Sequence, residues 1–156
     1  MAGAPSPSAP WCAEVVERLR RAPCVIVLGE TGCGKTTLLP QLLHDNGYGA
    51  VVVTQPRRVA ATAAARRVAE LRGGRVGAEV GYAIRFDQAV SSATRIKFVT
   101  DGVLLREAVA TPSLPQCATA RLATPFQART LPRRAGDTLP RCGDAQVPID
   151  SARRGA

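Results

Sequence analysis

Apolar residues follow two patterns between residues 11 and 110 of the chain. Short continuous apolar runs are typical of strands buried in a sheet, whereas apolar residues three or four positions apart are typical of amphipathic helices. The patterns alternate, so the chain is predicted to be α/β with a parallel sheet, its first two strands and the helix between them forming one β-α-β unit. The expected strands are 24–28, 50–54, 79–86 and 95–100, and the expected helices are 11–21, 36–43, 54–71 and 101–109.

The two ends of the chain lack these patterns. Residues 1–10 are small, rich in proline and serine, and uncharged, which is typical of a disordered leader. Residues 111–156 contain six prolines and one aromatic residue, so we expect this tail to be disordered as well. The folded unit is therefore expected to be 11–110.

The segment 24–43 reads CVIVLGETGCGKTTLLPQLL, an apolar strand, a glycine-rich turn and an apolar-periodic helix. Gly29, Gly34, Lys35 and Thr36 match the pattern G-x-x-x-x-G-K-[ST]. In this arrangement backbone N–H groups surround a phosphate, the lysine reaches the outer phosphates and the hydroxyl ligates Mg²⁺. A Cβ would block the tight turn, and the following helix points its positive end at the anion. The segment predicts a phosphate-binding loop, the alternative being a glycine-rich turn that binds nothing.

Charge favours a polyanionic partner. The chain of 156 residues has a formal net charge of +9, and all of its 21 basic residues except Lys35 and Lys97 are arginine. Guanidinium groups pair well with phosphate, although an arginine-rich genome would produce the same bias. Five cysteines without CxxC spacing, no signal peptide and no apolar run of about 18 residues indicate a reduced intracellular compartment and no membrane span.

A second candidate site is the segment 54–71, TQPRRVAATAAARRVAEL. Pro56 suits a first helical turn and the alanines favour a helix. Arg57 and Arg58 then lie at the helix N-terminus, just beyond a parallel strand, where phosphates bind well. The alternative is a solvated basic face.

Two further residues are of types that can act as ligands. His44 is the chain's single histidine, and we interpret it as a solvated residue near the end of the helix that follows the phosphate loop. Asp101 follows a strand, as a Mg²⁺ carboxylate does in phosphate-loop enzymes. Because Lys97 interrupts that strand's apolar run, we interpret Asp101 as a helix N-cap instead.

Four blocks, in order and spacing, resemble the DEAH-box family of ATP-dependent RNA helicases: GETGCGKTT, TQPRRVAA, VGYAIRFD and TDGVLLRE. The resemblance extends from about Val15 to Glu107 and corresponds to the N-terminal part of the first RecA-like domain of these enzymes. Other phosphate-loop enzymes share only the first block. The alternative interpretation, that the chain is a small kinase, therefore does not account for the second and fourth blocks.

The resemblance implies a site for ATP and Mg²⁺. Lys35 would contact the β- and γ-phosphates, Thr36 would ligate Mg²⁺ through its hydroxyl, and Arg67 would stack on the adenine. The residues implied for ATP binding are Gly29, Glu30, Thr31, Gly32, Cys33, Gly34, Lys35, Thr36, Thr37 and Arg67.

The resemblance also implies RNA as a partner. Arg57, Arg58 and Thr100 match positions near the RNA backbone, where contacts do not read sequence. Family members work in the nucleus, nucleolus or cytoplasm, and protein activators of these helicases are further expected partners. No role is assigned to the individual side chains of VGYAIRFD.

The chain departs from the family at several points. Cys33 stands where serine is usual, and Leu38 replaces a common glutamine. No D-E-A-H tetrapeptide follows LLRE, and the second RecA-like domain with its arginine fingers is missing, so no catalytic set is complete. Arginine fingers contribute about 10³–10⁵ in rate. Our hypothesis is a truncated, mis-spliced or frame-shifted product whose tail, from about Ala108 or Thr111, is not native to the family.

Two interpretations remain open. The chain is an incomplete helicase that binds nucleotide at most, or it is a catalytically inactive nucleotide- and RNA-binding module whose basic tail is an interaction segment. On the first interpretation the sheet lacks the strand that carries the acidic motif. We then expect the chain to be aggregation-prone or partly molten on its own.

Overall fold

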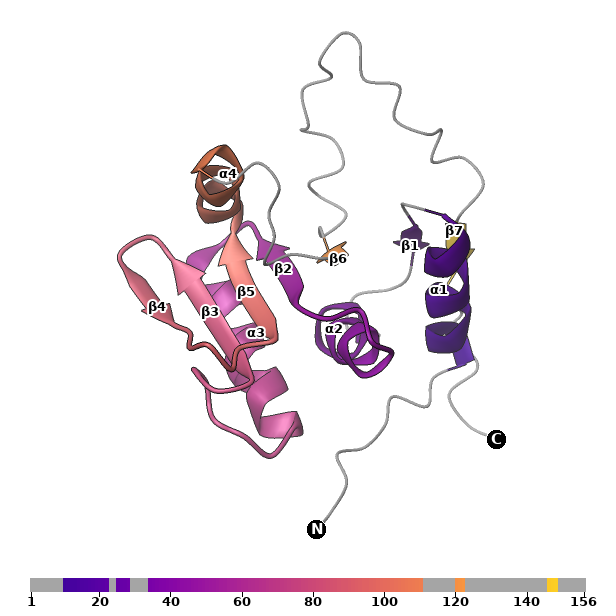
Figure 1. Cartoon of the computed structure of the whole chain (residues 1–156), viewed down its shortest axis with the longest axis horizontal. Coiled ribbons are helices and arrows are strands. Elements are labelled where there is room, and N and C mark those ends of the chain that lie inside the picture. The colour runs from indigo at the N-terminus through magenta and orange to yellow at the C-terminus, as the bar shows by residue number, and fades with distance from the viewer. Residues whose placement is uncertain (1–9, 23–24, 29–33, 111–119, 123–145, 149–156) are drawn as a thin grey trace, which may run out of the picture.

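The predicted α/β fold is confirmed by the computed structural model, which describes residues 10–22, 25–28, 34–110, 120–122 and 146–148 (Figure 1). No helix in these ranges reaches the length and apolarity that crossing a membrane requires. The helices are α1 (Pro10–Arg21), α2 (Lys35–Asp45), α3 (Arg58–Leu71) and α4 (Asp101–Ala110). The strands are β1 (Ile26–Leu28), β2 (Val51–Gln55), β3 (Val80–Ile84), β4 (Asp87–Ala89), β5 (Ile96–Thr100), β6 (Ala120–Leu122) and β7 (Gln146–Pro148).

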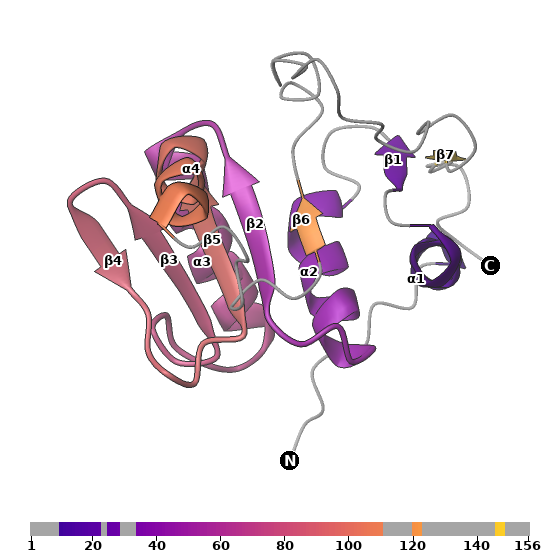
Figure 2. The same cartoon turned by 45° about the horizontal axis from the view of Figure 1, so that its top comes forward.

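Five strands form the main sheet in the order β4-β3-β5-β2-β6 (Figure 2). β3, β5, β2 and β6 run parallel, as the alternating patterns predicted. β4 was not expected and pairs antiparallel with β3, which makes the sheet mixed. The close hairpin explains Gly81, because a Cβ there would collide with the carbonyl oxygen of Ala89.

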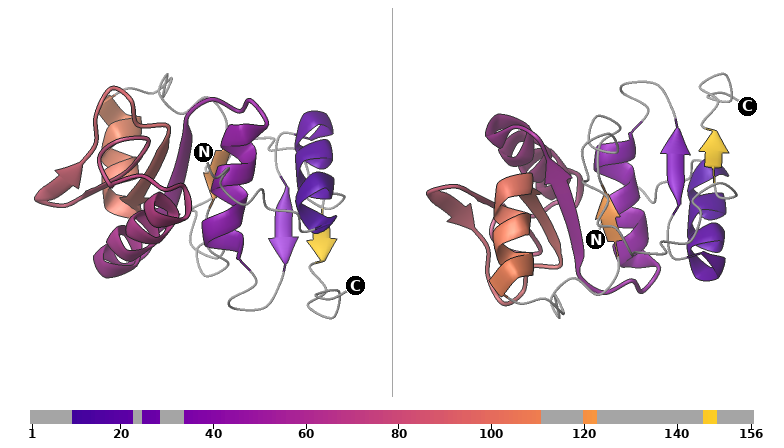
Figure 3. Two further views of the ribbon diagram at one scale, coloured as in Figure 1. Left: turned by 90° about the horizontal axis from the view of Figure 1, so that it is seen from below. Right: turned by 90° about the horizontal axis from the view of Figure 1, so that it is seen from above.

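The first strand does not lie where the sequence placed it. β1 pairs in parallel with β7 in a separate two-stranded sheet, so β1, α2 and β2 do not form the expected β-α-β unit within one sheet. α2 lies between this pair and the main sheet (Figure 3). β6 pairs with the other side of β2 and satisfies backbone groups that an edge strand leaves unpaired.

β6 and β7 both come from residues 111–156, in which the sequence indicated no element of the fold. The other residues of that segment, and the leader 1–9, lie outside the described residues.

The sheet buries apolar side chains on both faces. Val51 and Val53 of β2 point into the larger core, which is shared with α1, α2 and α3. Val52 points the other way, into a smaller core with Val99, against which Val103 of α4 packs. α3 and α4 accordingly lie on opposite faces of the sheet (Figure 3).

Small side chains bring α3 close to the sheet. Ala61 and Ala65 are completely buried on the face of α3 that contacts the larger core. The helix starts four residues later than the expected range 54–71: Pro56 lies outside it and Arg57 is its extended N-cap. The Ala61 N–H donates to the Arg57 carbonyl oxygen at 3.1 Å, so the first helical hydrogen bond begins at Arg57.

Candidate functional site

Three neighbouring parallel strands, β3, β5 and β2, end at one side of the sheet, which we call the carboxyl edge. The register pairs Gln55 with Thr100, the last residues of β2 and β5. Parallel strands carry their following loops at the same edge, where ligands of α/β proteins usually bind. Arg57 and Arg58 follow β2, and Thr100 is the last residue of β5, so the structure places all three at this edge. Their role in binding stays a prediction.

Arg57 and Arg58 lie at the N-terminus of α3 with exposed side chains. No side chain caps this helix end. The first N–H groups of a helix have no partner within the helix, and its dipole places positive charge at the same point. Two guanidinium groups beside such an end form a favourable place for a phosphate.

Arg85 and Phe86, to which the sequence assigned no role, form the two-residue turn between β3 and β4. Phe86 is 86% exposed, and the Arg85 guanidinium lies 4.7 Å from the centre of its ring. Phe86 has φ of 72°, a left-handed conformation that is strained for a bulky residue. Nearby, the Tyr82 hydroxyl donates to Asp87, and this hydrogen bond raises the pKa of Tyr82. An exposed aromatic ring held in this way at the carboxyl edge can stack on a base.

Gln55 is a buried polar residue at the same edge. Its side chain is 6% exposed, and among the described residues its Nε2 has no hydrogen-bond partner. An unsatisfied buried donor costs about 1–3 kcal/mol. The buried amide of Gln55 therefore lowers the stability of the fold locally, and other interactions in the fold offset this free energy.

The described end of the phosphate loop fits an anion at the start of α2. Gly34 has φ of 92°, and a Cβ there would lie 2.6 Å from the Leu38 Cδ1 atom. Only glycine suits both the conformation and the space. Lys35 and Thr36, half-buried, belong to the first turn of α2. The N-cap, Gly34, has no side chain that could accept from the first N–H groups of the helix. Residues 29–33, which hold the other predicted loop positions, lie outside the described residues.

Arg67 lies away from the carboxyl edge. It is in the second half of α3 with its side chain 62% exposed, 3.6 Å from Glu70. Asp101 begins α4 and is exposed. Across the described ranges, no group of three or more His, Cys, Asp and Glu residues could hold a metal ion.

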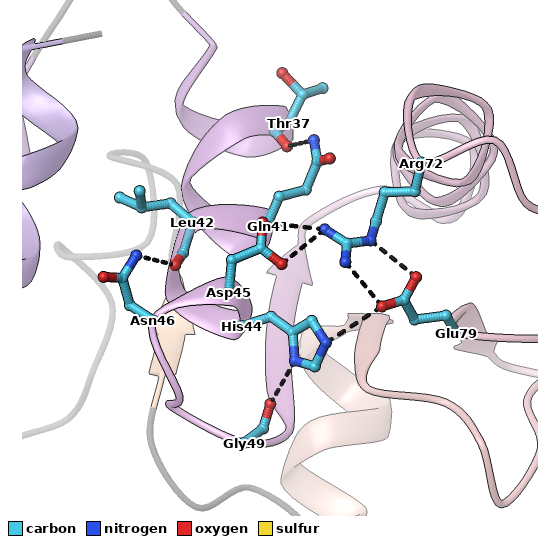
Figure 4. Close-up of polar contacts among 9 residues, drawn as sticks. All are labelled: Thr37, Gln41, Leu42, His44, Asp45, Asn46, Gly49, Arg72 and Glu79. Carbon is cyan, nitrogen blue, oxygen red and sulfur yellow. Dashed lines mark hydrogen bonds and ion pairs between the residues drawn. The ribbon is translucent and has the colours of Figure 1, made fainter. Parts of the chain in front are cut away.

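The interpretation of His44 as solvated is wrong. Its side chain is 22% exposed and contacts Gly49 and Glu79, which places it in a polar cluster with Asp45 and Arg72 (Figure 4). Hydrogen bonds from Arg72 lower the pKa of Glu79, and the same hydrogen bonds raise the pKa of Arg72. The periodicity of α2 could not reveal this cluster because its partners come from segments distant in sequence. The cluster lies at the opposite end of the strands from the carboxyl edge, and we call that end the amino edge.

Curated proteins match much of this chain. The ATP-dependent RNA helicase DEAH13 of Arabidopsis thaliana is 48% identical over 103 residues, 60% of this chain and 8% of that protein. The probable ATP-dependent RNA helicase DHX35 of Homo sapiens is 57% identical over 95 residues, 58% of this chain and 14% of that protein. The matched part of this chain is therefore similar to one segment of several DEAH-box RNA helicases.

A further DEAH-box relative is the pre-mRNA-splicing factor ATP-dependent RNA helicase DEAH10 of A. thaliana, 49% identical over 104 residues, 64% of this chain and 14% of that protein. The chain thus spans between 8% and 14% of the length of these relatives. No protein-family model matches it.

The DEAH-box blocks explain how the carboxyl edge is built. TQPRRVAA forms the end of β2 and the start of α3, VGYAIRFD forms β3 and its turn, and TDGVLLRE forms the end of β5 and most of α4. Three blocks that are separate in the sequence of this chain, 54–61, 80–87 and 100–107, therefore meet along one side of the sheet.

Proposed function

We propose that this chain binds ATP with Mg²⁺ and single-stranded RNA as part of an ATP-dependent RNA helicase of the DEAH-box type. The observation that carries this proposal is the convergence of three DEAH-box blocks on the carboxyl edge. The printed names of the relatives, which are ATP-dependent RNA helicases, support the choice of ATP and RNA as ligands.

ATP is assigned to the start of α2 and the loop before it. Gly34 leaves the first turn of α2 open to a phosphate, Lys35 binds the β- and γ-phosphates and Thr36 ligates Mg²⁺. The remaining loop contacts come from Gly29, Glu30, Thr31, Gly32, Cys33 and Thr37, and Arg67 is assigned to the adenine. Mg²⁺ neutralises developing charge on the phosphates during transfer.

RNA is assigned to the carboxyl edge. Arg57 and Arg58 bind backbone phosphates at the N-terminus of α3, and Thr100 contacts the backbone from the end of β5. Phe86 adds a surface on which a base stacks, with the Arg85 guanidinium behind it. None of these contacts depends on base identity, which suits a protein that moves along any strand.

Hydrolysis is not assigned to this chain alone. Its sequence contains no D-E-A-H tetrapeptide to orient Mg²⁺ and the attacking water. We expect nucleotide binding with turnover near background, and we place the protein inside the cell because a relative is named a splicing factor.

The nucleotide assignment is tested by titrating the purified chain with a fluorescent ATP analogue, with Mg²⁺ and with EDTA. Binding that requires Mg²⁺ and is lost in Lys35→Ala supports it. Arg75→Ala is the control, because Arg75 is an exposed cation distant from α2's first turn. Equal binding by Lys35→Ala and the wild type would rule the assignment out, and RNA-stimulated turnover would direct attention back to Asp101 as a carboxylate.

The RNA assignment is tested by measuring the affinity for a uridine oligonucleotide at several salt concentrations. Each lost phosphate contact reduces the salt slope by about 0.7. Arg57→Gln with Arg58→Gln is expected to reduce it by about 1.4, and Arg75→Gln is expected to leave it unchanged. Equal slopes in all three proteins would contradict the assignment.

A second candidate is the inactive binding module with a basic tail. It is favoured by β6 and β7, because two segments of the tail pair with β2 and β1. Removing residues 111–156 and measuring RNA affinity distinguishes this module from the helicase part proposed above. A loss of RNA affinity with the fold intact supports the module, and unchanged affinity supports the helicase part without it.

A further inference from the structure

α2 contains a proline just beyond its first turn, residues 35–38. Pro40 has no N–H, so it cannot donate to the carbonyl oxygen four residues earlier, that of Thr36, and its ring crowds this carbonyl. The backbone hydrogen bonds that join the first turn to the rest of α2 therefore lack one member. This turn is the part of α2 to which phosphate and Mg²⁺ are assigned.

The side chain of Gln41 spans the weakened part of the helix. Its Nε2 donates to the carbonyl oxygen of Thr37 at 2.6 Å (Figure 4). Gln41 is 5% exposed, on a helix that buries Leu39, Leu42 and Leu43 in the larger core. A buried amide costs free energy unless it is hydrogen-bonded. The contact with Thr37 therefore accounts for a polar side chain at this position.

Thr37 connects Gln41 to the N-cap of α2. The Thr37 N–H donates to the carbonyl oxygen of Gly34 at 3.1 Å, and the Thr37 hydroxyl donates to the same oxygen at 3.4 Å. The N–H of Leu38 donates to this oxygen as well, at 2.7 Å. A continuous set of hydrogen bonds thus extends from Gln41 to Gly34, the last residue before α2.

We propose that Gln41 is a positioning residue for the nucleotide site: its amide takes over from the backbone hydrogen bond that Pro40 removes and holds the first turn of α2 in the orientation that binds phosphate. Because its side chain is buried and contacts the backbone, Gln41 acts through Thr37 and is not itself a ligand-binding group. The effect on nucleotide affinity rests on the proposed function, whereas the effect on the turn is a property of the chain without ligand.

The other end of α2 provides a matched control. Asn46, the C-cap, donates through Nδ2 to the carbonyl oxygen of Leu42 at 2.9 Å (Figure 4). Both contacts join a side-chain amide to the carbonyl oxygen four residues earlier in the same helix. They differ in the end of the helix that they hold, so only the contact of Gln41 is expected to affect the first turn.

The first measurement is amide hydrogen exchange of the whole chain without ligand. Gln41→Met keeps the length of the side chain and removes the donor. The N–H groups of Leu38 and Leu39, which close the first turn, are therefore expected to exchange about fivefold faster than in wild type. Asn46→Ala is expected to leave these two rates unchanged. Equal exchange of both groups in Gln41→Met and wild type overturns the proposal.

The second measurement is the affinity for a fluorescent ATP analogue with Mg²⁺. Gln41→Met is expected to weaken binding by about fivefold, and Asn46→Ala is expected to leave it unchanged. Full affinity in Gln41→Met overturns the positioning role. If the wild type does not bind the analogue while exchange changes as expected, the effect on the turn is supported and the proposed function is contradicted.

Pro40→Ala provides a test that keeps Gln41 and does not depend on the folding of Gln41→Met. Alanine restores the N–H that donates to the carbonyl oxygen of Thr36, so the exchange of Leu38, relative to that of Leu43 in the same protein, is expected to slow by about threefold. An unchanged ratio contradicts the missing backbone hydrogen bond as the weak point of the helix.

The double variant Pro40→Ala/Gln41→Met tests whether the two residues act on the same turn. Pro40 is fully buried and its replacement leaves space, so the double variant is compared with Pro40→Ala and not with wild type. With the backbone hydrogen bond restored, the loss of the Gln41 amide is expected to change exchange and affinity by about twofold or less. Changes as large as those in the proline-containing chain overturn the proposal.

Discussion

Gln55 and Thr100 lie opposite each other in the parallel register of β2 and β5, each at the last residue of its strand. This pairing brings the starts of α3 and α4 to the same edge of the sheet, because each helix begins within three residues of the strand before it. Arg57 and Asp101 consequently belong to one edge although 44 positions separate them in the sequence. Register, rather than proximity along the chain, assembles the candidate RNA surface.

Replacing Gln55 is expected to stabilise the fold. Gln55→Met keeps the length of the side chain and removes a buried donor that has no partner among the described residues. The free energy of unfolding should rise by about 1 kcal/mol, as measured by urea denaturation. Gln88→Met, on the exposed strand β4, is the control and should change little. A loss of stability in Gln55→Met would mean that its amide has a partner in solution.

Phe86 is expected to matter for RNA and little for stability. Phe86→Leu removes the ring but keeps an apolar side chain at an exposed turn, and base stacking contributes about 1–3 kcal/mol per base. We expect the affinity for a uridine oligonucleotide to fall by about tenfold and the melting temperature to stay nearly constant. Phe86→Tyr should retain the affinity. Equal weakening by both substitutions would exclude stacking as the cause.

Gly34 and Gly102 are expected to respond to alanine in opposite ways. Gly34→Ala places a Cβ against Leu38 in a left-handed conformation, so it should cost about 1–3 kcal/mol and abolish nucleotide binding. Gly102→Ala lies in α4 with open space around it, and it should stabilise the chain by about 0.5–1 kcal/mol. Differential scanning calorimetry of the two variants checks both directions. Matching shifts would contradict the described start of α2.

The close contact between α3 and the sheet predicts a strong dependence on side-chain volume. Ala65 is fully buried on the face of α3 that contacts the larger core, whereas Ala63 is exposed on the same helix. Ala65→Leu should reduce the free energy of unfolding by about 1–3 kcal/mol because the helix must move outward, and Ala63→Leu should change it little. Chemical denaturation of both variants measures the difference. Similar values for the two would argue against the described face of α3.

Acid should weaken the polar cluster through Glu79. Hydrogen bonds from Arg72 lower the pKa of Glu79, so the unfolded chain binds this proton more readily than the folded chain. The resulting stability is present above the unfolded value, near 4.5, and is lost as pH falls through the lower folded value. Glu79→Gln should therefore flatten the acid limb of the stability profile, and Glu70→Gln, an exposed position on α3, should leave it as in wild type. Identical acid limbs in all three proteins would refute this contribution.

The sequence predicted the elements well where the apolar pattern is long and local. α1, α2, α3, β2, β3 and β5 all lie within a few residues of their expected bounds, because periodicity and burial follow directly from the side chains. The sequence also placed Arg57 and Arg58 just beyond the end of a parallel strand, as the structure does, whereas the position of Thr100 at the same edge came only with the strand register.

Other structural features depend on contacts with residues distant in the sequence, which a local apolar pattern cannot predict. β4 is polar and forms only because β3 offers it an edge, and β1 pairs with β7 instead of joining β2. The strain at Phe86 and the polar cluster at His44 likewise depend on tertiary contacts. The roles of the phosphate-loop residues and of Arg67 stay predictions until nucleotide binding is measured.

The amino-edge cluster has a consequence for how such a chain can change over evolutionary time. α2 and α3 are anchored to each other and to β3 through Asp45, Arg72 and Glu79, at the ends of the helices that point away from the proposed ligands. Mutations among the loops of the carboxyl edge can therefore accumulate without loosening these anchors. Related proteins can therefore differ in the ligands that these loops bind while keeping the same arrangement of helices and sheet.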